Sequence, residues 1–186
     1  TPGVVTILTR DELQASGGRD LAEVLARVPG FELGGDVESA AGAGFRGVWG
    51  QEGKILFLVD GVEMNDLSYG SFPLLRHLNV EQLERIEVIR GPGSALYGGH
   101  AELAVVNVIT RASLLDGGSV ALAGWRTSET SGGSATAAAG ATVGALRLGA
   151  TASVGTGPES NETFTDIYGD QVDMADSTRI RPALVT

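Results

Sequence analysis

Hydrophobic and polar residues alternate in the middle of the chain, and the alternation predicts a strand. Ile86 and Val88 are separated by Arg85 and Glu87, which is the period of a strand with one buried and one solvated face. Further along, Ala104–Thr110 is apolar at nearly every position. We therefore expect a second strand there, with both of its faces buried.

A glycine-rich segment separates these two strands. Gly91-Pro92-Gly93 should end the first strand, because proline lacks an N–H group and glycine permits a positive φ. Ser94–Tyr97 is long enough for one helical turn, which Gly98-Gly99 should end.

The first thirty residues predict one strand and two short helices. Val4–Leu8 has the composition of a strand, and Thr9 followed by Glu12 has the capping-box spacing of a helix start. A second helix is expected over Asp20–Arg27, ended by a Pro-Gly pair. Four of its apolar residues fall on one face, which we interpret as ordinary core: Leu21, Val24, Leu25 and Val28.

The next fifty residues predict short strands separated by loops. Phe31–Leu33 and Phe45–Val48 are expected to be extended, and Lys54–Val59 should pair with Val62–Met64 through a type I′ turn at Asp60-Gly61. Asn79 can cap a short helix that includes Leu83. Three segments rich in glycine and polar residues are predicted loops: Gly34–Gly44, Trp49–Gly53 and Asn65–Pro73.

After Asp116 the composition shifts to alanine, glycine, serine and threonine, and the alternation becomes strict. Gly118–Arg126 can form a first strand, and Thr178–Val185 can form a fourth. Between them, two more strands each place apolar residues on one face: Ala135, Ala137, Ala139, Ala141 and Val143, then Leu146, Leu148, Ala150, Ala152 and Val154. Such segments fit a transmembrane β-barrel or a soluble antiparallel sheet, and the pattern alone does not separate the two.

The composition of the chain excludes several kinds of functional site. The 186 residues contain no cysteine, so disulfides and thiolate metal sites are excluded, and the net charge of −10 argues against a nucleic-acid partner. His77 and His100 lack metal-ligand spacing, the glycines near Pro92 do not match a dinucleotide-binding turn, and no catalytic triad is indicated. We therefore expect neither an enzyme nor a cofactor nor a metal site.

An acidic segment near the end of the chain allows two interpretations. It contains six carboxylates and no basic residue before Arg179: Glu159, Glu162, Asp166, Asp170, Asp173 and Asp176. Oxygen ligands at this density could hold Ca²⁺, but the spacing lacks the frame of an EF-hand loop. A solvated loop is the interpretation that we favour.

One family combines these motifs in this order. The string ERIEVIRGPGSALYG followed by VNVITR, preceded by VPG at Val28–Gly30, RG at Arg46-Gly47 and LVDG at Leu58–Gly61, resembles the plug domain of TonB-dependent outer-membrane receptors. The resemblance covers roughly residues 4 to 111. The family usually has Gly-Gly before its last plug strand, where this chain has Leu103-Ala104.

The resemblance implies an α+β fold and a transport function. Residues 1–115 would form a plug domain with a small mixed β-sheet and short helices, and residues 116–186 the first three or four antiparallel strands of an incomplete transmembrane barrel. Since these receptors close a barrel of about 22 strands, the rest of the barrel must come from the same chain or a partner chain. Further implied partners are TonB in the periplasm, a small-molecule ligand (siderophore, cobalamin, sugar or metal chelate) and the bacterial outer membrane. An alternative is a plug-bearing component of a split or secretion-linked complex that gates passage of a protein.

The resemblance also assigns two groups of site residues. The family's outward plug loops correspond to the three loops above, and their candidate ligand-binding residues are Trp49, Gln51, Asn65, Tyr69 and Phe72. The alternative is that the rings of these residues pack onto the plug itself. In the family, charged residues on the plug face form salt bridges to the barrel interior. The matching candidates for this docking role are Arg46, Glu84, Arg85, Glu87 and Arg90.

Overall fold

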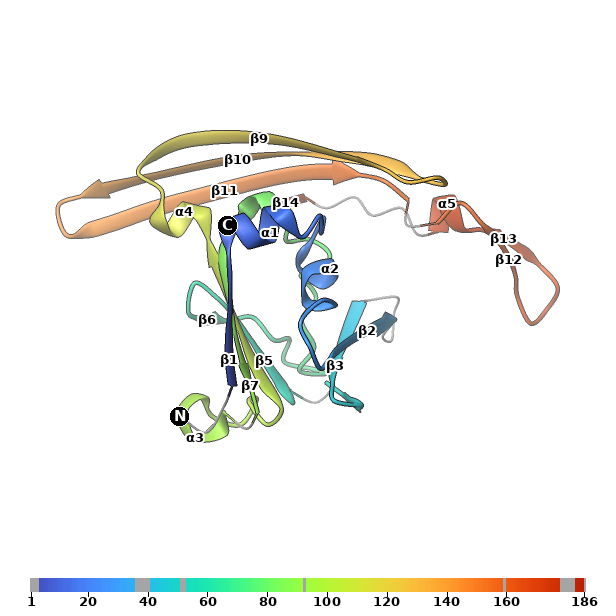
Figure 1. Ribbon diagram of the computed structural model, residues 1–186, viewed down its shortest axis with the longest axis horizontal. Coiled ribbons are helices and arrows are strands. Elements are labelled where there is room, and N and C mark those ends of the chain that lie inside the picture. The colour runs from blue at the N-terminus through green and yellow to red at the C-terminus, as the bar shows by residue number, and fades with distance from the viewer. Residues whose placement is uncertain are drawn as a thin grey trace. The chain divides into compact units, whose positions relative to one another are not determined.

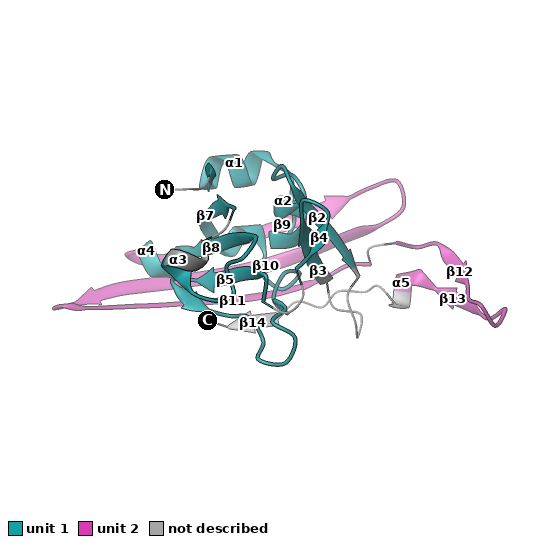
Figure 2. Cartoon of the chain, turned by 90° about the horizontal axis from the view of Figure 1, so that it is seen from below, with its two compact units in different colours: residues 1–114 teal, residues 115–186 magenta. Residues whose placement is uncertain are grey.

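The computed structural model describes residues 4–35, 41–50, 53–91, 93–158, 160–177 and 183–185. The chain divides into two compact units, Thr1–Leu114 and Leu115–Thr186, which Figure 2 colours separately. We describe each unit by itself.

A five-stranded mixed sheet forms the centre of the first unit (Figure 1). Its strands lie in the order β1 (Val4–Thr9), β7 (Leu83–Arg90), β8 (Ala104–Thr110), β5 (Ile55–Val59) and β6 (Val62–Glu63). Strands β5 and β8 pair in parallel, and all other neighbours pair antiparallel. The sheet is therefore mixed, as predicted.

The hydrophobic pattern of the two central strands explains their position. In β7, Ile86 and Val88 are fully buried, while Arg85 and Glu87 stay partly exposed. In β8 the side chains of Val105, Val106 and Val108 are buried, but Asn107 and Ile109 are partly exposed. The prediction that both faces of β8 are buried therefore holds for the face of Val106 and Val108, whereas the other face is buried only at Val105.

Two short helices complete the core of this unit. Helix α1 (Arg10–Ala15) starts with the predicted capping box, in which Thr9 and Glu12 each bond to the other's backbone N–H. Helix α2 (Leu21–Leu25) is shorter than predicted at both ends. Asp20 is its N-cap and accepts from the Glu23 N–H at 2.9 Å, and Ala26 is its C-cap. Its apolar stripe is buried as expected: Leu21, Val24, Leu25 and Val28.

A separate three-stranded sheet corrects one loop prediction. Strands β2 (Phe31–Gly35), β3 (Ala41–Phe45) and β4 (Val48–Trp49) pair antiparallel, so both ends of the predicted loop Gly34–Gly44 are strand. Small residues form a strand here because the Trp49 ring covers two glycines of the sheet. A Cβ on Gly34 would approach that ring to 3.1 Å, and one on Gly44 to 3.2 Å.

Short helical turns connect the remaining elements of the first unit. The 3₁₀ turn η2 (Val80–Gln82) follows Asn79 and ends where β7 begins at Leu83. The predicted single turn is present as α3 (Ser94–Tyr97), and α4 (Arg111–Leu114) follows β8 at the end of the unit. Among the described residues, no helix has the length and apolar character that crossing a membrane requires.

The second unit consists of long antiparallel strands (Figure 1). Its four-stranded sheet has the order β14 (Ala183–Val185), β11 (Leu146–Thr156), β10 (Ser131–Val143) and β9 (Gly117–Arg126). A separate hairpin of β12 (Thr163–Thr165) and β13 (Gln171–Asp173) precedes the one-turn helix α5 (Met174–Ser177).

The register of this sheet places apolar side chains together on one face. Ala135 pairs with Leu122 on one side and with Val154 on the other, so all three share a face. Leu122 and Val154 are 81% and 61% exposed. The neighbouring register row, Thr136 with Ser153, belongs to the opposite face. In a soluble sheet the apolar face is buried and the polar face meets water. In this sheet the apolar face is exposed, and the hydroxyl groups lie on the opposite face, as in the wall of a membrane barrel.

Candidate functional site

The loop after β6 is fastened to the central sheet by one amide. The Asn65 side chain accepts a hydrogen bond from Phe57 N at 2.7 Å and donates to the carbonyls of Ile55 at 2.9 Å and Gly70 at 2.7 Å. These three hydrogen bonds use most of the hydrogen-bonding capacity of an amide side chain. Asn65 therefore holds the loop in place, and its polar atoms face the protein.

The next residue, Asp66, shapes the tip of the loop. Its carboxylate accepts from the backbone N–H groups of Ser68 at 2.9 Å, Tyr69 at 2.8 Å and Ser71 at 2.8 Å. The Ser71 hydroxyl also donates to it. The Ser71 hydroxyl and these N–H groups lower the pKa of Asp66 by favouring the ionised form.

This backbone arrangement turns two side chains outward and one inward. Leu67 and Tyr69 are exposed, the former fully. Phe72 is only 2% exposed, because its ring stacks on Phe57 with 4.6 Å between ring centroids. Of the predicted ligand residues on this loop, Tyr69 is exposed and Asn65 is partly exposed, but the Asn65 amide is already bonded to the protein. The prediction for Phe72 is corrected, since its ring is part of the core.

The other predicted ligand residues come from the small sheet. Trp49 ends β4 and is partly exposed, with its indole ring over Gly34 and Gly44. Gln51 lies outside the described residues.

On the charged face of β7, two predicted docking residues pair with each other. Arg85 Nε lies 2.7 Å from Glu87 Oε1, and Asn107 Nδ2 of the neighbouring strand donates to Glu87 Oε2 at 3.1 Å. These contacts lower the pKa of Glu87, the bond from Arg85 having the largest effect. Glu84 is partly exposed on the same strand.

The two remaining arginines approach one turn from different elements. Arg90 Nη1 lies 3.4 Å from the Pro29 carbonyl, and Arg46 N donates to the Gly30 carbonyl at 2.7 Å. The Arg46 guanidinium also lies 5.0 Å from the centre of the Phe45 ring, within cation–π range. The structure thus brings together two motifs that are separate in sequence, VPG and RG.

Two features of this region escaped the sequence prediction. Leu67 is the most exposed large apolar side chain of the loop, yet it was not singled out. The sequence Asp66-x-x-Tyr-Gly could have indicated the turn that exposes Leu67, because an aspartate followed closely by a glycine favours a tight turn. Asp60, recognised only as a turn residue, also bonds to Thr110 across the sheet.

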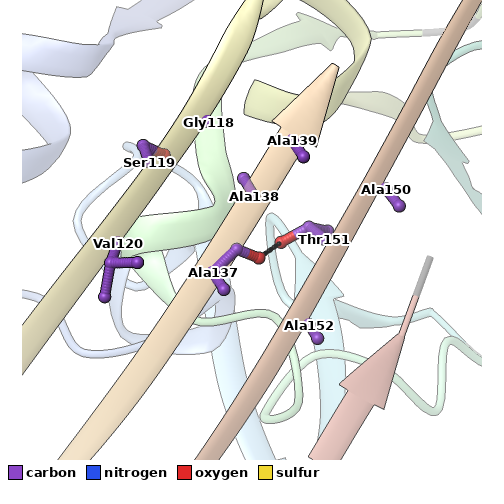
Figure 3. A pocket seen from close by; sticks show the side chains of 9 residues that line it. All are labelled: Gly118, Ser119, Val120, Ala137, Ala138, Ala139, Ala150, Thr151 and Ala152. Carbon is purple, nitrogen blue, oxygen red and sulfur yellow. Dashed lines mark hydrogen bonds between the residues drawn. The ribbon is translucent and has the colours of Figure 1, made fainter. Parts of the chain in front are cut away.

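No group of three or more potential metal-ligating residues occurs in the described part of the chain. His100 Nδ1 lies 2.5 Å from Glu63 Oε1, which makes this histidine part of an exposed pair. Figure 3 shows a shallow hollow on the second unit, lined mainly by alanines of β10 and β11. Its polar side chains are Ser119 and Thr151, and the Thr151 hydroxyl donates to the Ala137 carbonyl at 3.2 Å.

Curated relatives of the chain are transporters. It is 43% identical over 119 residues to the vitamin B12 transporter BtuB of Vibrio vulnificus, and 33% identical over 107 residues to the transporter of the same name from Photobacterium profundum. These matches cover 62% and 57% of this chain. They span only 19% and 17% of the relatives' own length.

Solved structures show the same fold. The ferric enterobactin receptor PfeA of Pseudomonas aeruginosa, crystallised as a mutant with enterobactin, superposes with a TM-score of 0.65 at 23% identity. The match covers 87% of this chain and 26% of that one. The siderophore receptor PirA of the same organism gives 0.59 at 26% identity, covering 88% and 30%.

The family assignment rests on the first unit. The TonB-dependent Receptor Plug Domain model matches residues 1–105, which is more than half of the chain. The matched residues include the VPG turn, the RG turn, the LVDG hairpin and β7. The chain therefore belongs to the TonB-dependent receptor plug domain family.

Proposed function

We propose that residues 1–115 are the plug, and residues 116–186 the first barrel strands, of a TonB-dependent transporter in the bacterial outer membrane. One observation supports this most strongly. A unit of the plug family is followed at once by β9, β10 and β11, whose open face is apolar. An exposed apolar face on a sheet is what a lipid-facing barrel wall requires.

The rest of the barrel is the first partner in this proposal. An open sheet edge is not stable in hydrocarbon, because each unpaired N–H or C=O group costs several kcal/mol. Strands that complete the barrel therefore have to pair with β9 and β14. TonB is the second partner. In this scheme TonB pulls on the plug from the periplasm and opens a path for the bound ligand, and no step of the cycle is catalytic.

The docking residues fit a plug that is held and yet can move. Arg85 and Glu87 are partly exposed and paired with each other, so each keeps capacity for a further partner on the barrel wall. Exposed ion pairs contribute only about 0–1 kcal/mol each. A face held by several such pairs, with Arg46, Glu84 and Arg90 contributing, resists loss of the plug without fixing it permanently.

A corrinoid is the ligand class that we favour. The relatives with 43% and 33% identity are named vitamin B12 transporters, whereas the match to the enterobactin receptor, at 23%, supports the fold alone. Tyr69 and Trp49 offer ring faces at low conformational cost, which suits a bulky ring-bearing ligand. A secretion-linked role receives no support from the relatives reported above.

Uptake of radiolabelled cyanocobalamin by cells that produce the complete receptor tests the proposal. Cells with TonB should bind and internalise the label, and cells without TonB should bind it without internalising it. Uptake that is equal in both strains would contradict a TonB-dependent cycle. Absence of binding by a receptor that is present in the outer membrane would contradict the ligand class.

A further inference from the structure

Trp125 lies near the end of β9, on the face of the sheet that carries the hydroxyl groups. It pairs with Gly132 of β10. Leu122, three residues earlier, pairs with Ala135 of the apolar face. Because successive side chains of a strand point to opposite faces, Trp125 and Leu122 lie on different faces of the sheet. Their exposure agrees with this assignment, since Leu122 is 81% exposed and Trp125 only partly.

The indole ring of Trp125 covers one glycine of β10 and another at the end of β11. A Cβ on Gly132 would lie 2.1 Å from Cζ2 of the ring, and a Cβ on Gly157, which directly follows β11, would lie 2.3 Å from the same atom. Only glycine fits at such distances. Gly157 is buried although it has no side chain. The ring therefore supplies the packing that the two glycines lack, as aromatic residues do beside glycines in other sheets.

The chain that leaves β11 is fastened a second time a few residues later. Residues 155–158 have the sequence Gly-Thr-Gly-Pro, and glycine permits many backbone conformations, so this segment alone would not fix the direction of the β12–β13 hairpin. Asn161 Nδ2 donates to the Glu129 carbonyl in the β9–β10 turn at 2.8 Å. That turn is itself closed by Thr127 Oγ1, which accepts from Thr130 N at 2.9 Å.

The face on which Trp125 lies excludes one common role of tryptophan in barrel proteins. Aromatic residues near the ends of barrel strands often face the lipid and lie at the membrane–water interface. Trp125 has a suitable position along its strand. However, the apolar face is the one with Leu122, and the Trp125 ring packs on the opposite face over Gly132 and Gly157.

From these observations we infer that Trp125 is a clasp on the inner face of the barrel wall, which fixes the start of the β12–β13 hairpin to the β9–β10 hairpin and does not contact lipid. The inference rests on the proposed function, which makes the apolar face of the sheet the outer face of the barrel. It adds a conformational role. Together with the Asn161 bond, the ring holds the β12–β13 hairpin in one direction despite its glycine-containing connection.

Quenching of tryptophan fluorescence by brominated lipids tests the inner-face position in the complete receptor, reconstituted into vesicles. The emission of Trp125 is the difference between the parent and Trp125→Phe, and the brominated lipids should leave it unquenched. Leu122→Trp, made in the Trp125→Phe background, is the matched control because it places the ring on the apolar face. The emission that Leu122→Trp adds should be quenched.

Hydrogen exchange of the same reconstituted receptor tests the clasp. Gly157→Ala should displace the ring, since the nearest atom to the new Cβ belongs to the Trp125 side chain. The Trp125 emission should then shift to longer wavelength, and amides around Asn161 should exchange faster. Trp125→Ala should also speed this exchange, and Trp125→Phe should do so less. Gly118→Ala is the control in the same sheet, because a Cβ there would meet no atom closer than 3.9 Å.

Each result supports or overturns a separate part of the inference. Quenching of the Trp125 emission by brominated lipid would overturn the inner-face position. Parent-like exchange around Asn161 in both Gly157→Ala and Trp125→Ala would overturn the clasp. If the emission of Leu122→Trp is not quenched, the apolar face does not meet lipid. That result would overturn the proposed function and the inner-face position together, whereas the exchange measurement would still decide on the clasp.

Discussion

Asp60 and Thr110 join the β5–β6 turn to the end of β8. The Asp60 carboxylate accepts from Thr110 N at 2.8 Å and from Thr110 Oγ1 at 2.6 Å, and Thr110 is only 1% exposed. Asp60 itself has a φ of 49°, a left-handed conformation that aspartate and asparagine tolerate better than most residues. A single residue thus closes the predicted hairpin and fixes the last strand of the plug.

Replacing Asp60 by alanine should lower the free energy of unfolding by about 1–3 kcal/mol, because two buried donors of Thr110 lose their acceptor. Asp60→Asn is the matched control, since asparagine keeps one oxygen acceptor and tolerates the same φ; its loss should be smaller. Denaturant unfolding of the chain measures both. An Asp60→Ala variant that is as stable as the parent would show that the carboxylate bonds do not matter.

Gly91→Val should destabilise the plug. Gly91 has a φ of 118°, and forcing a β-branched residue into that region costs on the order of 1–3 kcal/mol. Gly99→Val serves as control, because Gly99 has open space and an ordinary φ. Thermal unfolding compares them, and an unchanged melting temperature for Gly91→Val would count against the strained turn.

Asp20 should make the plug less stable as the pH rises above 3.8. Burial, the largest influence, raises the pKa of Asp20 above its ordinary value of 3.8, despite the bond from Glu23 N and the nearby Arg76. The folded state then holds the proton more tightly than the unfolded state, so the favourable contribution is complete below pH 3.8 and is lost as the pH passes the folded pKa.

The difference in unfolding free energy between the parent and Asp20→Asn isolates this effect. Asparagine keeps the cap on α2 without titrating. The free energy of unfolding of the variant should therefore increase relative to that of the parent as the pH rises. A difference that is constant with pH would show that Asp20 titrates normally.

Substitutions of Tyr69 and Trp49 should both weaken ligand binding but should differ in their effect on stability. Tyr69→Ala should weaken cyanocobalamin binding by the complete receptor without changing stability, since the Tyr69 side chain is exposed on a turn that its backbone holds. Trp49→Ala should weaken binding and also destabilise the small sheet, because its ring covers Gly34 and Gly44. If both variants bind like the parent, these loops serve only as scaffold.

Residues 116–186 should exchange their amide hydrogens quickly in detergent-free solution. Their strands are rich in alanine and expose the apolar face, so little burial offsets about 1–2 kcal/mol of backbone entropy per residue. In a lipid-reconstituted complete receptor the same strands should exchange slowly. Slow exchange of this segment in an isolated, detergent-free monomer would refute the expectation.

Local interactions in the sequence were sufficient to predict several elements. Thr9 and Glu12 form their capping box within one helical turn, Asp60-Gly61 adopts the two positive φ angles of a type I′ turn, and the alternation around Ile86 places β7. In each case the interacting groups lie a few residues apart, so spacing alone specifies the geometry. Family motifs added the α+β class and the order of the units.

Distant contacts decided the rest. Ala41–Phe45 is a strand only because β2 and the Trp49 ring pack against its small residues, and Phe72 is core only because Phe57 lies beneath it. Asn65 appeared to be a loop residue, yet its amide bonds to two residues of β5. No pattern of residue types specifies such pairings, because the partner is brought near only when the sheet forms. The sequence alone therefore determined the elements and the family, and the tertiary structure decided which of the candidate side chains remain free to meet a ligand.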